Sequence, residues 1–145
     1  MEASARLPAE PTTPRLAREF VHSCVEDLDS SDAAETIALL TTEIVTNAVL
    51  HARTEMQVQV ERGADWVWVG VRDGSRTSPT QRRYSRDAAT GRGLVLLELM
   101  AREWGVDVDS SGKTVWFKVS LTEADAAAPD LDFFLSFDAD LGAER

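Results

Sequence analysis

The chain has little of what would cross-link it or hold it on a nucleic acid. Its 145 residues include one cysteine, Cys24, which excludes an internal disulfide and any cysteine-cluster metal site. Basic residues are also few, with 15 Lys and Arg against 25 Asp and Glu and a net charge of −10. Binding to a phosphate backbone depends on clustered basic side chains that displace counterions. The composition therefore argues against nucleic acid as a direct partner.

Long apolar runs are lacking as well. The longest are too short to span a bilayer, and residues 1–8 do not have the charged-then-apolar layout of a signal peptide. We therefore expect a cytoplasmic protein without a membrane partner. The hydrophobic content of 43% is enough for one domain with a real core. In that core Cys24 is expected as a small apolar helix residue rather than a reactive thiol.

Changes in composition along the chain predict three parts. Residues 1–13 contain prolines and few apolar side chains, which is typical of a disordered lead-in. Residues 14–121 form the expected domain. From Glu123 onward seven acids stand against one base, a net charge of −6 that leaves −4 for residues 1–122. Residues 122–145 are therefore expected to form a separate acidic and aromatic tail.

Periodicity within the domain predicts two helices, a hairpin, a long loop, a third helix and a second hairpin. Apolar residues recur at helical spacing in three segments and alternate with polar residues in four. The expected helices cover 14–28, 33–52 and 91–100, the strands cover 56–61, 66–71, 104–109 and 113–121, and the loop covers 73–90. Helices on one face of a mixed, mostly antiparallel sheet would give a two-layer α/β sandwich.

The second expected helix carries three polar side chains among mostly apolar residues. Glu43, Asn47 and His51 are spaced four residues apart, which places them on one helix face beside Ile44 and Val45. Such groups must either be satisfied inside the fold or line a cavity that holds a ligand. The motif therefore indicates a buried polar network or a binding site.

Two glycine-containing segments lie at the edges of the expected elements. Asp73-Gly74 ends a strand and begins the loop, while Gly91-Arg92-Gly93 ends the loop and begins a helix. Glycines at a helix N-terminus let backbone N–H groups approach a phosphate, aided by the helix dipole. A short Gly-x-Gly run by itself more often marks an ordinary turn.

In order and spacing, these three motifs resemble the N, G1 and G2 boxes of the histidine-kinase-like ATPase superfamily, which includes sensor kinases, gyrase B-type ATPases, Hsp90 and MutL. The single-domain build, the phrase over Asn47–Ala52 and the closing Gly112–Phe117 are similar to the anti-sigma-factor serine kinases and their actinobacterial relatives. The resemblance covers residues 14–121 and implies the histidine-kinase-like ATPase fold, with ATP and Mg²⁺ as cofactors.

The resemblance implies a role for each matching residue. Asn47 would ligate Mg²⁺ through its carboxamide oxygen. Glu43 would act as general base on a partner's serine or threonine. Asp73 would accept a hydrogen bond from the adenine amino group, and Gly74 would leave space for the base. The fuller Asp-x-Gly-x-Gly pattern is altered, because Ser75 and Thr77 stand where the family has glycine.

The remaining implied contacts are with the phosphates and the base. Gly91, Arg92, Gly93, Leu94 and Thr114 are assigned to nucleotide binding by their place in the matching motifs. The loop before Gly91 would be the ATP lid, and it contains Arg76, Arg82, Arg83 and Arg86. His51 is assigned to the same site, although a structural histidine is an equal alternative.

Two functions follow from the resemblance. The first is an anti-sigma factor with serine/threonine kinase activity, which sequesters a sigma factor and phosphorylates an anti-sigma-factor antagonist. Glu43 favours it, because a pure binding module does not need a base. The second is a non-catalytic ATP-binding module in which nucleotide switches partner binding, and the altered G1 box favours it. A sensor histidine kinase fragment is weaker, since His22 lies within the first expected helix.

Aromatic residues of the domain and of the tail suggest a contact between them. Trp66, Trp68 and Trp116 are expected on the sheet face away from the helices, where they would need cover. The tail carries an apolar cluster of Leu131, Phe133, Phe134, Leu135, Phe137 and Leu141. The cluster would dock either on a partner or on this sheet face, in the same molecule or across a homodimer, and we favour the sheet.

Overall fold

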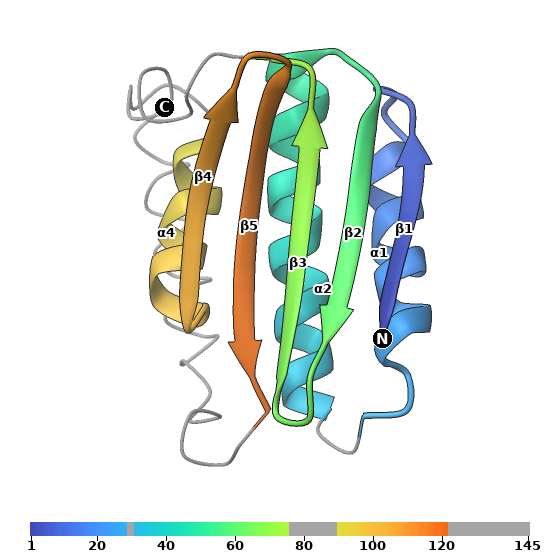
Figure 1. Ribbon diagram of the computed structural model, residues 1–145, viewed down its shortest axis with the longest axis vertical. Coiled ribbons are helices and arrows are strands. Elements are labelled where there is room, and N and C mark those ends of the chain that lie inside the picture. The colour runs from blue at the N-terminus through green and yellow to red at the C-terminus, as the bar shows by residue number, and fades with distance from the viewer. Residues whose placement is uncertain (29–30, 76–89, 122–145) are drawn as a thin grey trace, which may run out of the picture.

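The computed structural model describes residues 1–28, 31–75 and 90–121. Five antiparallel strands in the order β1-β2-β3-β5-β4 form a sheet, and the helices cover one of its faces (Figure 1). The elements are β1 (Glu2–Leu7), α1 (Thr13–Val25), α2 (Ser31–Asn47), η1 (Ala48–Ala52), β2 (Met56–Arg62), β3 (Trp66–Asp73), α4 (Thr90–Met100), β4 (Glu103–Asp109) and β5 (Gly112–Ser120). The predicted two-layer α/β sandwich is confirmed, as are its three helices and two hairpins.

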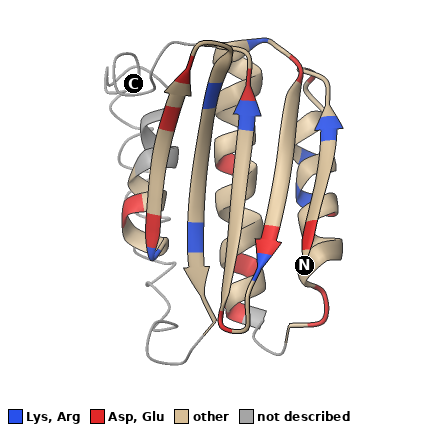
Figure 2. Ribbon diagram, in the orientation of Figure 1, with Lys and Arg blue, Asp and Glu red and all other residues tan. Residues whose placement is uncertain are grey.

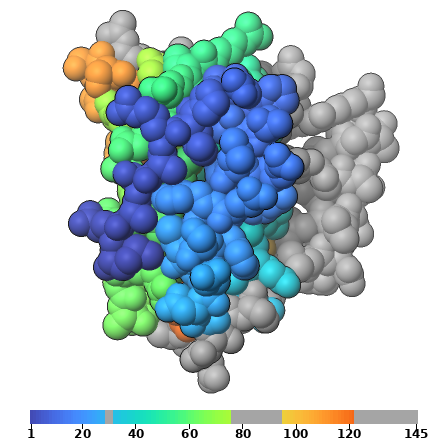
Figure 3. Space-filling view, turned by 90° about the vertical axis from the view of Figure 1, so that its right-hand side faces the viewer, coloured from blue at the N-terminus to red at the C-terminus, as the bar shows by residue number. Residues whose placement is uncertain are grey.

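The expectation of a disordered lead-in over residues 1–13 is wrong. Glu2–Leu7 form the edge strand β1, which pairs antiparallel with β2 from Glu2 opposite Glu61 to Leu7 opposite Met56. Alternate residues are half-buried while those between them are exposed. An edge strand needs only one weakly apolar face and one bonded edge, so the few small side chains here suffice. In Figure 3, β1 and α1 together form one side of the molecule.

Helix α1 packs through a single stripe. Pro14 lies in its first turn, where a missing N–H costs nothing, and Ala17, Val21 and Val25 follow at four-residue spacing and are fully buried. Cys24 is half-buried on this helix, and burial raises the pKa of its thiol. This agrees with the expectation of a small apolar residue, since a raised pKa disfavours the reactive thiolate.

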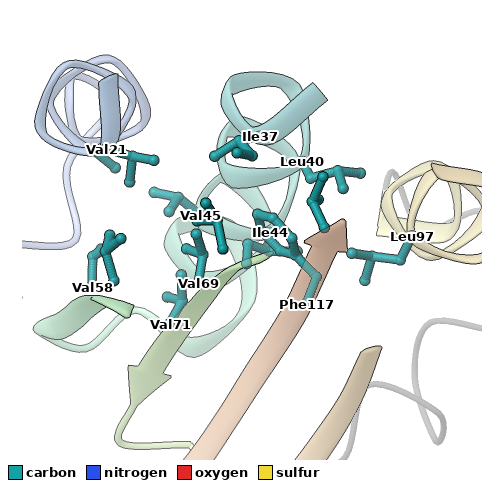
Figure 4. Close-up of a cluster of buried hydrophobic side chains, with 14 of the residues drawn as sticks. Val21, Ile37, Leu40, Ile44, Val45, Val58, Val69, Val71, Leu97 and Phe117 are labelled. Carbon is teal, nitrogen blue, oxygen red and sulfur yellow. The ribbon is translucent and has the colours of Figure 1, made fainter. Parts of the chain in front are cut away.

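The hydrophobic core lies between the helices and the inner face of the sheet. Figure 4 shows side chains of α1, α2 and α4 meeting those of β2, β3 and β5. Its labelled residues are Val21, Ile37, Leu40, Ile44, Val45, Val58, Val69, Val71, Leu97 and Phe117. The inner residues of β3 alternate with outward-facing tryptophans, which is the period-two pattern that predicted the strand.

Helix α2 is the central helix of the layer. Counted together with η1, Asp32–Ala52 is long and apolar enough to cross a membrane by length and composition alone, so the expectation that every apolar run is too short needs revision. In this fold α2 packs against α1, α4 and the sheet, and Ile37, Leu40 and Val45 are completely buried. Its apolar composition is therefore explained by its place in the core.

The outer face of the sheet carries the predicted tryptophans. Trp68 and Trp116 stack with ring centroids 6.4 Å apart and an interplanar angle of 25°, and the Lys118 ammonium lies 4.7 Å from the Trp66 ring. Figure 2 shows that charged residues gather near the strand ends and leave the middle of this face uncharged. The tail over 122–145 lies outside the described residues, so its docking on this face stays a prediction.

Candidate functional site

The three motifs meet at one end of the molecule. In Figure 1, α2 runs toward the end at which β3 finishes, and the N-terminus of α4 lies at that same end. Helix α4 packs against α2, and η1 lies against β3. Met56, the first residue after the helix connection, pairs with Asp73 at the end of β3. The antiparallel connections therefore bring together segments that are far apart in the sequence.

Glu43 and Asn47 lie one turn apart near the C-terminal end of α2. The Glu43 side chain is buried, with the residue only 8% exposed, whereas Asn47 is half-buried. Neighbouring Thr42 and Thr46 donate their hydroxyl hydrogens to carbonyls four residues earlier, at 2.9 and 2.7 Å. A buried carboxylate is costly unless it is paired or hydrogen-bonded, and its place one turn before Asn47 makes Glu43 a candidate for chemistry.

The helix changes its winding immediately after Asn47. Residues Ala48–Ala52 form a π-helical turn, which ends at Arg53 in the left-handed conformation with φ 57°. The Arg53 N–H donates to the Ala48 carbonyl at 3.2 Å, closing this wider turn. Such turns are frequent at functional sites. Half-buried His51, the third residue of the predicted motif, lies within this wider turn and not in the regular part of α2 that carries Glu43 and Asn47.

Asp73 sits in a buried ion pair at the end of β3. Its side chain follows Val67, Val69 and Val71 onto the helix-facing side, and the residue is 4% exposed. The Ser75 N–H donates to its Oδ1 at 2.8 Å. The Lys113 ammonium, on a residue 5% exposed, lies 3.1 Å from Oδ2 and 3.3 Å from Oδ1. The pair places a basic group directly beside the carboxylate that is predicted to bind the adenine base.

The structure does not bring Thr114 to this pair. Its hydroxyl contacts Arg72 Nη1 at 3.4 Å, on the sheet face opposite to Asp73, because successive strand side chains alternate between faces. Lys113 is the residue that sequence reasoning missed. Its inward position could have been predicted from the sequence. Val115, Phe117 and Val119 alternate as the inward-facing residues of β5, and Lys113 lies two residues before Val115 on the same face.

Gly74 connects the end of β3 to the segment that leaves η1. Its N–H donates to Thr54 Oγ1 at 2.8 Å. A methyl group built on Gly74 would lie 3.4 Å from the nearest Thr54 atoms, an ordinary contact. A polar hollow of about 330 Å³ opens beside Asp73 and Gly74. It lies toward the outer sheet face, where Gln57, Arg72 and Ser111 line it, and its lining does not include Glu43 or Asn47.

The remaining predicted contacts come from the start of α4 and the loop before it. Gly91, Arg92, Gly93 and Leu94 lie in the first turns of α4, as their glycine pattern predicted. A helix N-terminus offers free N–H groups to an anion. The side chains of these four residues, and residues 76–89 of the lid predicted between Asp73 and Gly91, lie outside the described structure.

An ion pair on the outer sheet face borders the hollow and gives a prediction about pH. Arg72 Nη2 lies 3.0 Å from Asp109 Oδ1, and this bond, with two from Ser111, holds the Asp109 pKa well below its usual range. A lowered folded-state pKa stabilises the fold above the unfolded value of about 3.9. That stabilisation disappears as the pH falls through the folded value.

We therefore expect Asp109→Asn to lower the melting temperature at pH 7 and to lose this effect progressively below about pH 4. Thermal unfolding followed by circular dichroism across this range measures it. Asp107→Asn removes the same charge from the same face of β4, where the described residues offer it no ion pair. Equal responses of the two variants at every pH would contradict a specific role for the Arg72 pair.

Comparison with known proteins shows the family to which the chain belongs. The two-layer α/β fold carries Glu43 and Asn47 on a helix, Asp73 at a strand end and a helix N-terminus at the same end. Residues 7–119 match the family model described as histidine kinase-like ATPase domain. The chain belongs to this family, and membership implies that it binds ATP.

Solved structures show the same fold at low sequence identity. The RsbU and RsbW domains of Rv1364c from Mycobacterium tuberculosis superpose with a TM-score of 0.64 and 17% identity over 82% of this chain. The histidine kinase domain of the blue-light activated histidine kinase EL346 from Erythrobacter litoralis gives a TM-score of 0.53 and 22% identity over 68%. The matches span 32% and 49% of those chains. No curated protein sequence matches the chain.

Proposed function

We propose that this chain is a cytoplasmic anti-sigma factor with ATP-dependent protein serine/threonine kinase activity. It would bind a sigma factor and phosphorylate an anti-sigma-factor antagonist, without a nucleic-acid or membrane partner. The observation that carries this proposal is the buried carboxylate of Glu43 one turn before Asn47. A domain that only holds nucleotide has no use for a buried base at this place.

The residues at this end of the fold fit ATP and Mg²⁺. Asn47 offers a hard carboxamide oxygen of the kind that Mg²⁺ accepts. Asp73 keeps acceptor capacity on its buried carboxylate for an N–H of the base. The backbone at Gly91–Leu94 presents helix N-terminal donors. Bound ATP with Mg²⁺ would supply the γ-phosphoryl group.

Within this proposal, the chain's own groups orient the reactants and move one proton. Asn47 and the start of α4 would hold the phosphate end of the nucleotide, and Asp73 would hold the adenine end. Glu43 accepts the proton of the partner's serine or threonine hydroxyl, which increases the nucleophilicity of that oxygen. The buried position of Glu43 limits competing proton exchange with water.

A second function is supported by a different observation. The strand end after Asp73 lacks the family's glycines, and Asp73 is already engaged by Ser75 and Lys113. These features suit a module that binds ATP as a conformational switch and sequesters a partner without phosphorylating it. Incubation with labelled ATP, Mg²⁺ and candidate antagonists separates the two functions. ATP binding without transfer to any candidate would favour the switch.

The proposed metal role of Asn47 gives a direct prediction. Asn47→Ala is expected to weaken ATP binding by at least about tenfold in the presence of Mg²⁺, because one hard ligand is lost, and to change it little in EDTA. Isothermal titration calorimetry with and without Mg²⁺ measures both affinities. Thr46→Val, which removes only a hydroxyl bonded to its own helix, is the matched control. An equal loss under both conditions would remove Asn47 from the metal site.

A further inference from the structure

The Asp73–Lys113 pair presents a hydrogen-bond acceptor and a donor side by side at the end of β3, where the adenine base is proposed to bind. The ammonium has three N–H donors, and within the described residues it donates only to the Asp73 carboxylate. The carboxylate in turn receives Ser75 N–H and Lys113 and has further lone pairs. Both groups therefore keep hydrogen-bonding capacity beyond the pair itself.

Stability alone does not account for a charged pair at this place. The inward-facing side chains that follow Lys113 on β5 are those of Val115, Phe117 and Val119, and its partner strand contributes Val71 next to Asp73. A buried ion pair in such surroundings is often no more stable than apolar residues of similar volume. A use for the two polar groups toward a ligand explains why they are charged.

We propose that Lys113 reads the nucleotide base together with Asp73. The Watson–Crick edge of adenine presents an amino donor next to the ring acceptor N1, and flipped or free bases are commonly read along this edge. Asp73 accepts from the amino group while Lys113 donates to N1. The inference rests on the proposed ATP site and adds to it a second base contact that would turn a one-atom readout into a two-atom readout.

The experiment compares ATP with its 1-deaza analogue, in which a C–H group replaces N1. The full chain is expected to bind ATP about ten- to a hundredfold more tightly than the analogue, the usual effect of a hydrogen bond to a charged group. Lys113→Met should lose ATP affinity and bind both nucleotides equally. Thr114→Val, the next residue on the opposite sheet face, should keep the wild-type ratio. Lys113→Gln retains a neutral hydrogen-bond donor and should keep part of the preference for ATP over the analogue.

Each outcome bears on the inference. Equal binding of the two nucleotides by the wild-type chain would overturn it, even if Lys113→Met does not fold. A Lys113→Met variant that loses affinity for both nucleotides by the same factor would show that Lys113 only positions Asp73. If the wild-type chain binds neither nucleotide, the proposed function fails as well. If it binds ATP and shows no N1 discrimination, only the role of Lys113 fails.

Discussion

Glu43→Gln is expected to lower phosphoryl transfer to the protein substrate by about 10²–10⁴-fold, the usual contribution of a general base. Gln keeps the size and hydrogen-bonding shape of the side chain but cannot take the hydroxyl proton. ATP affinity should stay within about twofold, because only an interaction of the transition state is removed. Single-turnover transfer from labelled ATP to the antagonist measures the first quantity, and calorimetry with ATP and Mg²⁺ measures the second.

The same helix provides a control for charge and helix propensity. Glu35→Gln makes an identical chemical change on α2, two turns earlier and on an exposed side chain. It should leave both transfer and ATP binding unchanged. If Glu43→Gln transfers phosphate as fast as the wild type, the proton acceptor lies elsewhere and the kinase proposal loses the observation that carries it. A wild type that binds ATP but transfers to no candidate supports the switch instead.

Strong periodic signals predicted most of the fold. The alternation of valines with tryptophans on β3 and the four-residue spacing on α1 follow from one-sided burial. Strand β1 was missed because its stabilisation comes from pairing with β2, a partner some 50 residues away in the chain, and local sequence records such pairing weakly. The prolines that follow the strand also gave this segment a composition typical of disordered chains.

The candidate site was predictable in outline but not in register. Helical spacing singled out Glu43 and Asn47, the family resemblance singled out Asp73, and the fold brings their segments to one end. Thr114 and Lys113 are adjacent in sequence, yet only one can face Asp73, and that depends on which β5 residues point inward. The π-helical turn after Asn47 also escaped prediction, because a pattern with a period of four does not reveal a locally wider turn.

Gly112→Ala is expected to destabilise the fold by about 3 kcal/mol, at the upper end of ordinary overpacking. A Cβ at Gly112 would lie 2.0 Å from the Asp73 carbonyl oxygen, 3.1 Å from its carbonyl carbon and 3.3 Å from the Gly74 Cα. All three are backbone atoms, so no side chain can rotate away. The end of β3 itself must move, and it carries the Asp73 carboxylate with it.

Two measurements test this coupling of packing and function. Urea denaturation gives the free energy of unfolding, with a fall in melting temperature on the order of 10 °C expected for a chain of this size. ATP affinity should fall in the same variant, because the displaced end of β3 carries Asp73, whose carboxylate pairs with Lys113 on β5. Gly74→Ala is the control for stability, since its Cβ meets only Thr54 at 3.4 Å. A Gly112→Ala variant as stable as Gly74→Ala would mean that β3 and β5 do not approach each other so closely at this end.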